Sequence, residues 1–86
     1  MPEGIPVARQ WVVVLKNGQM VIDWGNRIFQ DIISGDFISP KENEISHLAQ
    51  DVELRWLKKN GTISHYDAQN VFFFSLPELP HNSEIE

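Results

Sequence analysis

Residues 10–24 have the sequence QWVVVLKNGQMVIDW, in which an Asn-Gly pair separates two runs rich in apolar and β-branched residues. This pattern predicts a β-hairpin, because Asn-Gly between such runs is the strongest short-range hairpin signal. A type I′ turn needs a positive φ at both central residues, and Asn17 and Gly18 tolerate that conformation. The stretch therefore predicts two antiparallel strands joined by a two-residue turn.

The length of this turn fixes the expected register of the hairpin. With a two-residue turn, Leu15 lies opposite Met20 and Val13 lies opposite Ile22. Side chains alternate along a strand, so one face of the hairpin would be entirely apolar: Trp11, Val13, Leu15, Met20, Ile22 and Trp24. A shift of one residue would bring polar side chains onto that face, so we expect burial to select this register.

A second Asn-Gly pair, Asn60–Gly61, lies within residues 52–66, VELRWLKKNGTISHY. Val52, Leu54 and Trp56 alternate with charged residues, which predicts a strand and a second hairpin. A two-residue turn would place Trp56 opposite His65. A longer loop that starts at Lys58 keeps the same alternation and is the alternative.

The segment between the two predicted hairpins carries a helix start signal. Ser39, Pro40 and Glu42 occupy the positions of an N-cap, a first helical residue and the third residue of a capping box. Apolar residues then follow at Ile45, Leu48 and Ala49, which is a helical spacing. The pattern predicts a helix from Pro40 to about Gln50.

Residues 27–34, RIFQDIIS, fit two structures. Their apolar positions suit one face of a short helix, which is the preferred interpretation, whereas their β-branched composition suits a strand. Residues 71–74, VFFF, are apolar on both faces and predict a final strand that is central or fully covered.

These elements predict a small α+β domain in which two β-hairpins and a final strand form an antiparallel sheet with an inserted short helical segment. An SH3-like small β-barrel is the alternative if residues 27–33 form a strand. Residues 9–76 are expected to form one globular domain. Residues 1–8 are expected to be a flexible N-terminal arm, and residues 77–86 a disordered acidic tail.

Composition narrows the classes of function. The 86 residues include no Cys, which excludes disulfides, cysteine nucleophiles and zinc fingers. The net charge is −5, and Glu3, Glu78, Glu84 and Glu86 lie in the two ends, so residues 9–76 are nearly neutral and lack the basic footprint of a nucleic-acid-binding domain. No apolar run approaches the roughly 20 residues that span a bilayer, and residues 1–10 lack the features of a secretory signal. The expected location is the cytoplasm.

Catalytic and metal-binding patterns are weak. Glu44 and His47 form one Glu-x-x-His pair with Asp51 nearby, whereas metal sites of this kind use the pair twice. His65, Tyr66 and Asp67 are consecutive, so on a strand they cannot converge on one substrate. The sequence therefore predicts no enzyme activity, no metal site and no cofactor, and it leaves His65 as a packing partner of Trp56.

The aromatic residues point to a binding surface instead. Three Trp, five Phe and one Tyr are hard to bury fully in a chain of this length, and exposed aromatic patches mark interfaces. The predicted surface contains Trp24, Trp56 and Tyr66, with Lys58 and Lys59 at its rim. It would contact a protein partner or a second copy of the chain, unless all three aromatics are core.

The predicted function is accordingly a non-enzymatic protein–protein interaction module, or an accessory or regulatory subunit of a larger assembly. The alternative is a small nucleic-acid-binding regulator that uses the lysines at the two hairpin tips, Lys16, Lys58 and Lys59.

Overall fold

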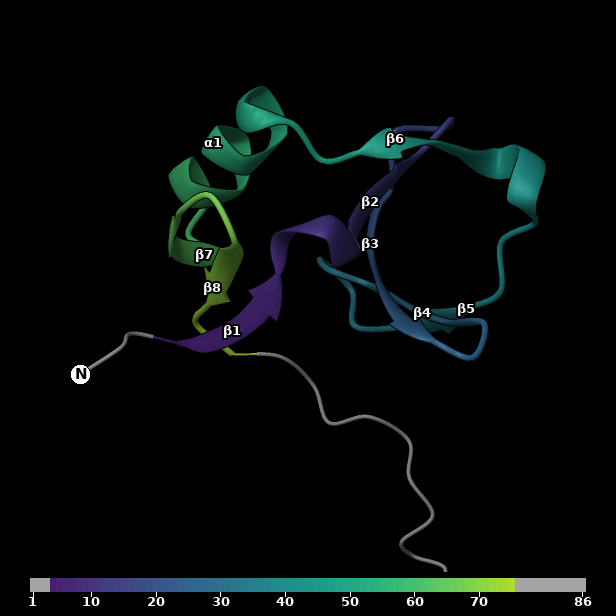
Figure 1. Cartoon of the computed structure of the whole chain (residues 1–86), viewed down its shortest axis with the longest axis horizontal. Helices are drawn as coiled ribbons and strands as arrows, with labels where there is room; N and C mark the ends of the chain where they lie inside the picture. Colours follow the sequence, from purple (N-terminus) through teal and green to yellow (C-terminus); the bar gives the residue numbers. More distant parts are fainter. Residues whose placement is uncertain (1–3, 76–86) are drawn as a thin grey trace, which may run out of the picture.

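The computed structural model describes residues 4–75 and contains two antiparallel sheets and one short α-helix, α1 (Figure 1). The three-stranded sheet has the order β1-β8-β7, and the five-stranded sheet has the order β5-β4-β3-β2-β6. The strands are β1 (Ile5–Ala8), β2 (Val12–Leu15), β3 (Met20–Gly25), β4 (Ile28–Asp31), β5 (Phe37–Ile38), β6 (Ile45–Leu48), β7 (Ile63–Tyr66) and β8 (Asn70–Phe73). The helical elements are α1 (Asp51–Lys59) and the 3-10 turns η1 (Arg9–Trp11) and η2 (Glu42–Glu44).

This architecture confirms the predicted α+β class. Neither sheet closes into a barrel, so the SH3-like alternative does not form. In Figure 1, α1 and the three-stranded sheet lie on one side, and the curved five-stranded sheet lies on the other.

Two hydrophobic clusters cover the two faces of the five-stranded sheet. The larger one joins that sheet to α1 and to the three-stranded sheet, and its buried members are Val7, Val12, Val14, Ile22, Ile32, Ala49, Leu54, Leu57, Ile63, Val71 and Phe73. The smaller one lies on the opposite face and consists of Val13, Leu15, Val21 and Phe29, with Ile38 and Ile45 packed against it. Both faces of strands β2 and β3 are therefore buried.

The β2–β3 hairpin forms where the Asn-Gly pair predicts it, but its turn and register differ from the prediction. Val13 pairs with Val21, and Val12 pairs with Ile22, one residue away from the expected partners. Leu15 N–H donates to the carbonyl of Gln19 at 2.8 Å, so the loop has three residues. Among the loop residues Lys16, Asn17 and Gly18, only Gly18 has a positive φ, of 92°, which matches a three-residue loop closed by a glycine bulge rather than a type I′ turn.

The predicted register is wrong for a physical reason. The prediction took burial of one wholly apolar face as the factor that selects the register, whereas Val12, Val14 and Ile22 lie in the larger cluster and Val13 and Val21 lie in the smaller one. When both faces of a hairpin are apolar and covered, a shift of one residue exchanges one buried set for another. The turn geometry then decides the register.

Residues 27–34 contain strand β4, so the preferred helix is wrong and the strand alternative is confirmed. A tight turn at Asn26 and Arg27 joins β3 to β4, with φ values of 53° and 63°. Two consecutive positive φ values are the signature of a type I′ turn. The two-residue turn expected at the first Asn-Gly pair thus occurs here, without a glycine at its centre.

The helix predicted from Pro40 to Gln50 is also wrong. Residues 42–44 make only the 3-10 turn η2, and residues 45–48 form strand β6 against β2. The expected capping interaction is shifted along the chain, because the side chain of Glu44 accepts a hydrogen bond from Lys41 N–H at 3.0 Å. Pairing with β2, far away in sequence, outweighs the local helix signal.

The strand predicted for residues 52–56 is replaced by helix α1, so the second hairpin is wrong. Leu54 and Leu57, three residues apart, are both fully buried, whereas Val52 and Trp56 are exposed. Gly61 follows the helix with a φ of 79°, the conformation that glycine supplies at a helix C-terminus. The second Asn-Gly pair therefore ends a helix instead of turning a hairpin.

The three-stranded sheet confirms the prediction for the final strand, whereas its first strand lies where an arm was expected. Strand β8 is central in this sheet, as expected from VFFF. Ile5–Ala8, which belonged to the expected N-terminal arm, forms strand β1 and pairs with β8. Residues 1–3 of that arm and the predicted tail, residues 77–86, lie outside the described residues.

Candidate functional site

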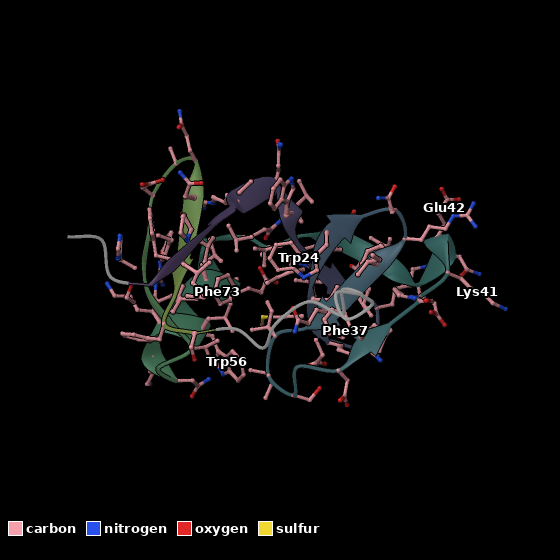
Figure 2. The ribbon with its side chains drawn as sticks, turned by 90° about the horizontal axis from the view of Figure 1, so that it is seen from below. Trp24, Phe37, Lys41, Glu42, Trp56 and Phe73 are labelled. Atoms are coloured by element: carbon pink, nitrogen blue, oxygen red, sulfur yellow. The ribbon has the colours of Figure 1, made fainter. Side chains whose placement is uncertain are left out.

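A groove opens between α1, the tip of the β2–β3 hairpin and the turn after β4. It has a volume of about 460 Å³ and is lined by Gly18, Gln19, Met20, Asp31, Ile33, Val52, Glu53 and Trp56. We call this site the α1 groove. Figure 2 shows Trp56 near one edge of the molecule, whereas Trp24 lies toward its middle.

Three large apolar side chains of the groove are exposed. Val52 is 63%, Ile33 is 62% and Trp56 is 49% exposed. Val52 and Trp56 are four residues apart, so they share one side of α1. Isolated apolar residues on a surface need no explanation, but three that line one groove form a patch of the kind found at binding sites.

One wall of the groove carries the buried carboxylate of Asp31, which is 9% exposed. It accepts hydrogen bonds from Gln19 Nε2 at 2.6 Å and from the N–H groups of Ile33 and Ser34, each at 2.8 Å. Burial raises the pKa of Asp31, but these hydrogen bonds together leave the pKa below its usual value. Asp31 is therefore ionised at neutral pH, and each of these donors is uncharged.

A second carboxylate, Glu53, lies on the helix side of the groove. Its two oxygens accept hydrogen bonds from Gln50 N–H at 2.7 Å and contact His47 Nε2 at 2.8 Å. Burial raises the pKa of Glu53, but these hydrogen bonds and the nearby charge of His47 leave it below its usual value. Glu53 thus caps its own helix and ties α1 to strand β6.

Three other cavities are larger. The smallest of them, of about 490 Å³, lies around Arg9 and Gln69. The other two have volumes of about 640 and 810 Å³ and share the lining residues Ser39, Pro40 and Lys41. The first contains Lys16 and Glu44, and the second contains Arg27 and Asp23. Their linings combine both signs of charge, whereas the α1 groove contains two carboxylates and neither Lys nor Arg.

The structure does not gather the predicted surface residues in one place. Trp24 and Tyr66 are partly buried and pack against the larger cluster. Trp24 Nε1–H donates to Gln30 Oε1 at 3.0 Å, and its ring lies 6.2 Å from that of Trp11. The guanidinium of Arg9 lies 5.3 Å from the centre of the Tyr66 ring. Of the three predicted aromatics, only Trp56 lines the α1 groove.

The predicted lysines lie on different elements. Lys58 and Lys59 are exposed in the last turn of α1, and Lys16 is exposed in the β2–β3 loop. Two of the three lysines are therefore not at a hairpin tip, which corrects the geometry assumed for the nucleic-acid alternative. Neither Lys58 nor Lys59 forms an ion pair with another residue in the range 4–75.

The two histidines singled out in the sequence, His47 and His65, each contact a side chain of another element. His65 stacks on Phe72, with ring centres 4.2 Å apart, and not on Trp56 as expected from the hairpin. His47 contacts Glu53, and Asp51 pairs with Arg9. No group of three His, Asp or Glu side chains within residues 4–75 is arranged to hold a metal ion.

Sequence reasoning missed Val52, Ile33 and the two groove carboxylates. Two spacings in the sequence could have revealed the helix. Leu54 and Leu57 are three residues apart and would share its inner side, and Val52 and Trp56 are four residues apart and would share its outer side. Asp31 and Ile33 could not be found in this way, because only the folded sheet brings them to α1.

Comparison of the chain with protein-family models, with curated proteins and with solved structures gave no match. Among residues 4–75 no helix has the length and apolar character needed to cross a lipid bilayer. The geometry of the α1 groove is therefore the basis on which a function can be assigned.

Proposed function

We propose that the protein is a non-enzymatic interaction module, or an accessory subunit of a larger assembly, that acts in the cytoplasm and binds a protein through the α1 groove. The observation that carries the proposal is the exposure of Ile33, Val52 and Trp56 around one groove. Tryptophan is among the residue types that most often anchor interfaces, and its N–H tolerates water when no partner is bound. Lys58 and Lys59 lie at the end of the same helix and provide a charged rim.

Trp24 and Tyr66 have a different place in this proposal. Both pack against the larger cluster and both have a polar or cationic neighbour within the chain. We therefore assign partner contact to Trp56 first, and we expect Trp24 and Tyr66 to contribute more to stability than to binding.

The test is an affinity capture from native lysate with the tagged chain as bait. We expect Trp56→Ala to abolish capture of the partner while the thermal melt followed by circular dichroism stays nearly unchanged. Phe74→Ala is the matched control, since Phe74 is 55% exposed and does not line the groove. Equal loss of capture in both variants, or unchanged capture in Trp56→Ala, would refute the groove as the binding site.

A further inference from the structure

The outward side of α1 combines apolar and basic side chains. Leu54 and Leu57 point into the core, so Val52, Arg55, Trp56 and Lys59, which follow at spacings of three and four residues, lie on the opposite side. All four are exposed. This side adjoins the α1 groove, because Val52 and Trp56 belong to both.

Charge along α1 is polarised from one end to the other. The first turn carries Asp51, which pairs with Arg9, and Glu53, which contacts His47, whereas Lys58 and Lys59 in the last turn form no ion pair within residues 4–75. The groove beside the first turn adds Asp31, whose described hydrogen-bond donors are uncharged. The surface therefore runs from the groove carboxylates Glu53 and Asp31 at one end, past Val52, Arg55 and Trp56, to Lys59 at the other end.

Such a surface is complementary to itself under a two-fold rotation. In a two-fold dimer the same patch meets on both copies, and each contact occurs twice. Antiparallel packing of two α1 helices would bring each acidic first turn to a basic last turn and would oppose the two helix dipoles favourably.

We propose that the occupant of the α1 groove is a second copy of the chain, in a two-fold dimer with antiparallel α1 helices. This inference rests on the function proposed above. The axis passes near Arg55 and Trp56. Val52 of each copy then lies level with Lys59 of the other, and the Trp56 side chains meet at the centre. Lys59 of one copy approaches the groove carboxylates of the other.

The expected dimer is weak. Stable specific interfaces bury about 1,200–2,000 Å² in total, whereas a nine-residue helix is only about 13 Å long. The wall of the groove formed by Gln19 and Ile33 must therefore join the contact. We expect a dissociation constant in the micromolar range, with dimerisation weakened by added salt.

Sedimentation velocity over rising protein concentration tests the association. The mass is expected to rise from monomer toward dimer, and Trp56→Glu is expected to keep the chain monomeric with an unchanged melt. Phe74→Glu, outside the groove, should still dimerise. A wild-type chain that stays monomeric at several hundred micromolar, or a Trp56→Glu variant that dimerises normally, would overturn the inference.

Single cysteines test the antiparallel geometry, since the chain has none of its own. With the axis near residues 55 and 56, Arg55→Cys should oxidise readily to a disulfide-linked dimer. The two copies of Val52→Cys should not, because they would be about 10 Å apart along the helix axes, and a disulfide needs Cα atoms within about 7 Å. Equal cross-linking of both variants would contradict the arrangement, as would faster cross-linking of Val52→Cys.

These outcomes separate the dimer from the function on which it rests. If the wild type stays monomeric in sedimentation, but captures another protein that Trp56→Ala does not capture, the proposed dimer is wrong and the proposed interaction module stands. If neither dimerisation nor capture depends on Trp56, both proposals are wrong.

Discussion

At position 4 the chain has no room for a side chain. Gly4 has a φ of +97°, and a Cβ at this residue would lie 2.0 Å from the carbonyl oxygen of Phe73. That oxygen belongs to the backbone of β8, the central strand of its sheet, so it cannot move without disturbing the pairing. Glycine at this position lets the first strand begin directly against β8.

We predict that Gly4→Ala destabilises the fold more than Gly18→Ala does. Gly18 has a similar φ, of +92°, but no atom lies within 4 Å of the position that a Cβ would take there. Alanine at Gly18 should therefore cost only the backbone strain, about 1 kcal/mol, whereas alanine at Gly4 adds a clash with backbone. Urea denaturation of both variants measures the difference, and equal losses would show that residue 4 does not approach β8 in solution.

The pair formed by His47 and Glu53 makes stability depend on pH. Because hydrogen bonds hold the folded-state pKa of Glu53 below its usual value, its contribution is complete above the unfolded-state pKa, about 4.3, and is lost as the pH falls through the folded-state pKa. We predict that Glu53→Gln lowers the melting temperature at pH 7 and that the difference from wild type shrinks at pH 3.

A double-mutant cycle with His47→Ala isolates the pair, because alanine has no side-chain donor. The effect of Glu53→Gln at pH 7 should be smaller in the His47→Ala background, where the contact at 2.8 Å is already missing. An effect of the same size in both backgrounds would mean that Glu53 acts only through its cap on Gln50 N–H.

At the scale of elements, α1 offers the clearest distinction between the helix observed and the strand expected from sequence. A strand would put Val52, Leu54 and Trp56 on one side, whereas the helix buries Leu54 and Leu57, each 0% exposed. We predict that Leu57→Ala costs about 2–5 kcal/mol and that Trp56→Ala costs less than about 1 kcal/mol. Thermal or urea melts of the two variants measure these costs. A larger loss of stability in Trp56→Ala than in Leu57→Ala would favour the strand.

Short sequence patterns predicted where elements end better than they predicted whether an element is a helix or a strand. Asn17–Gly18 and Asn60–Gly61 both mark real ends of elements, because glycine supplies the positive φ at Gly18 and Gly61. The identity of the element before each break depended on distant partners. Residues 45–48 became a strand because β2 was available for pairing, a contact that no short pattern contains.

The same limit applies to the candidate site. Trp56, Lys58 and Lys59 were predicted as surface residues from their type, and all three are exposed on α1. Their grouping with Trp24 and Tyr66 depended on a hairpin that does not form. Asp31, at the end of β4, and Ile33, in the turn after it, complete the groove, so the groove could not be derived without the tertiary fold.

At the scale of the whole molecule, the two ends of the described chain meet in the three-stranded sheet. Ile5 pairs with Phe73, and Val7 pairs with Val71, so residues far apart in sequence close one layer of the core. Val7 is 1% exposed and belongs to the larger cluster. The first strand is thus part of the packed structure, although its Pro and Gly content suggested an arm.

We predict that removal of residues 1–8 lowers the free energy of unfolding by at least about 2 kcal/mol, the value of burying one valine side chain. The deletion also leaves one edge of β8 open, which adds a template for aggregation. A deletion of similar length at the other end, residues 78–86, is the control and is expected to leave the melting temperature unchanged, because that segment lacks apolar periodicity.

The point variant Val7→Ala separates packing from pairing in this prediction. It keeps the backbone of β1 and removes only two methyl groups from the larger cluster, so it should lose part of the stability that the deletion loses and should remain monodisperse. If the deletion and Val7→Ala both melt like the wild type, β1 does not hold the two sheets together. The core between them would then have to be complete with α1, β7 and β8.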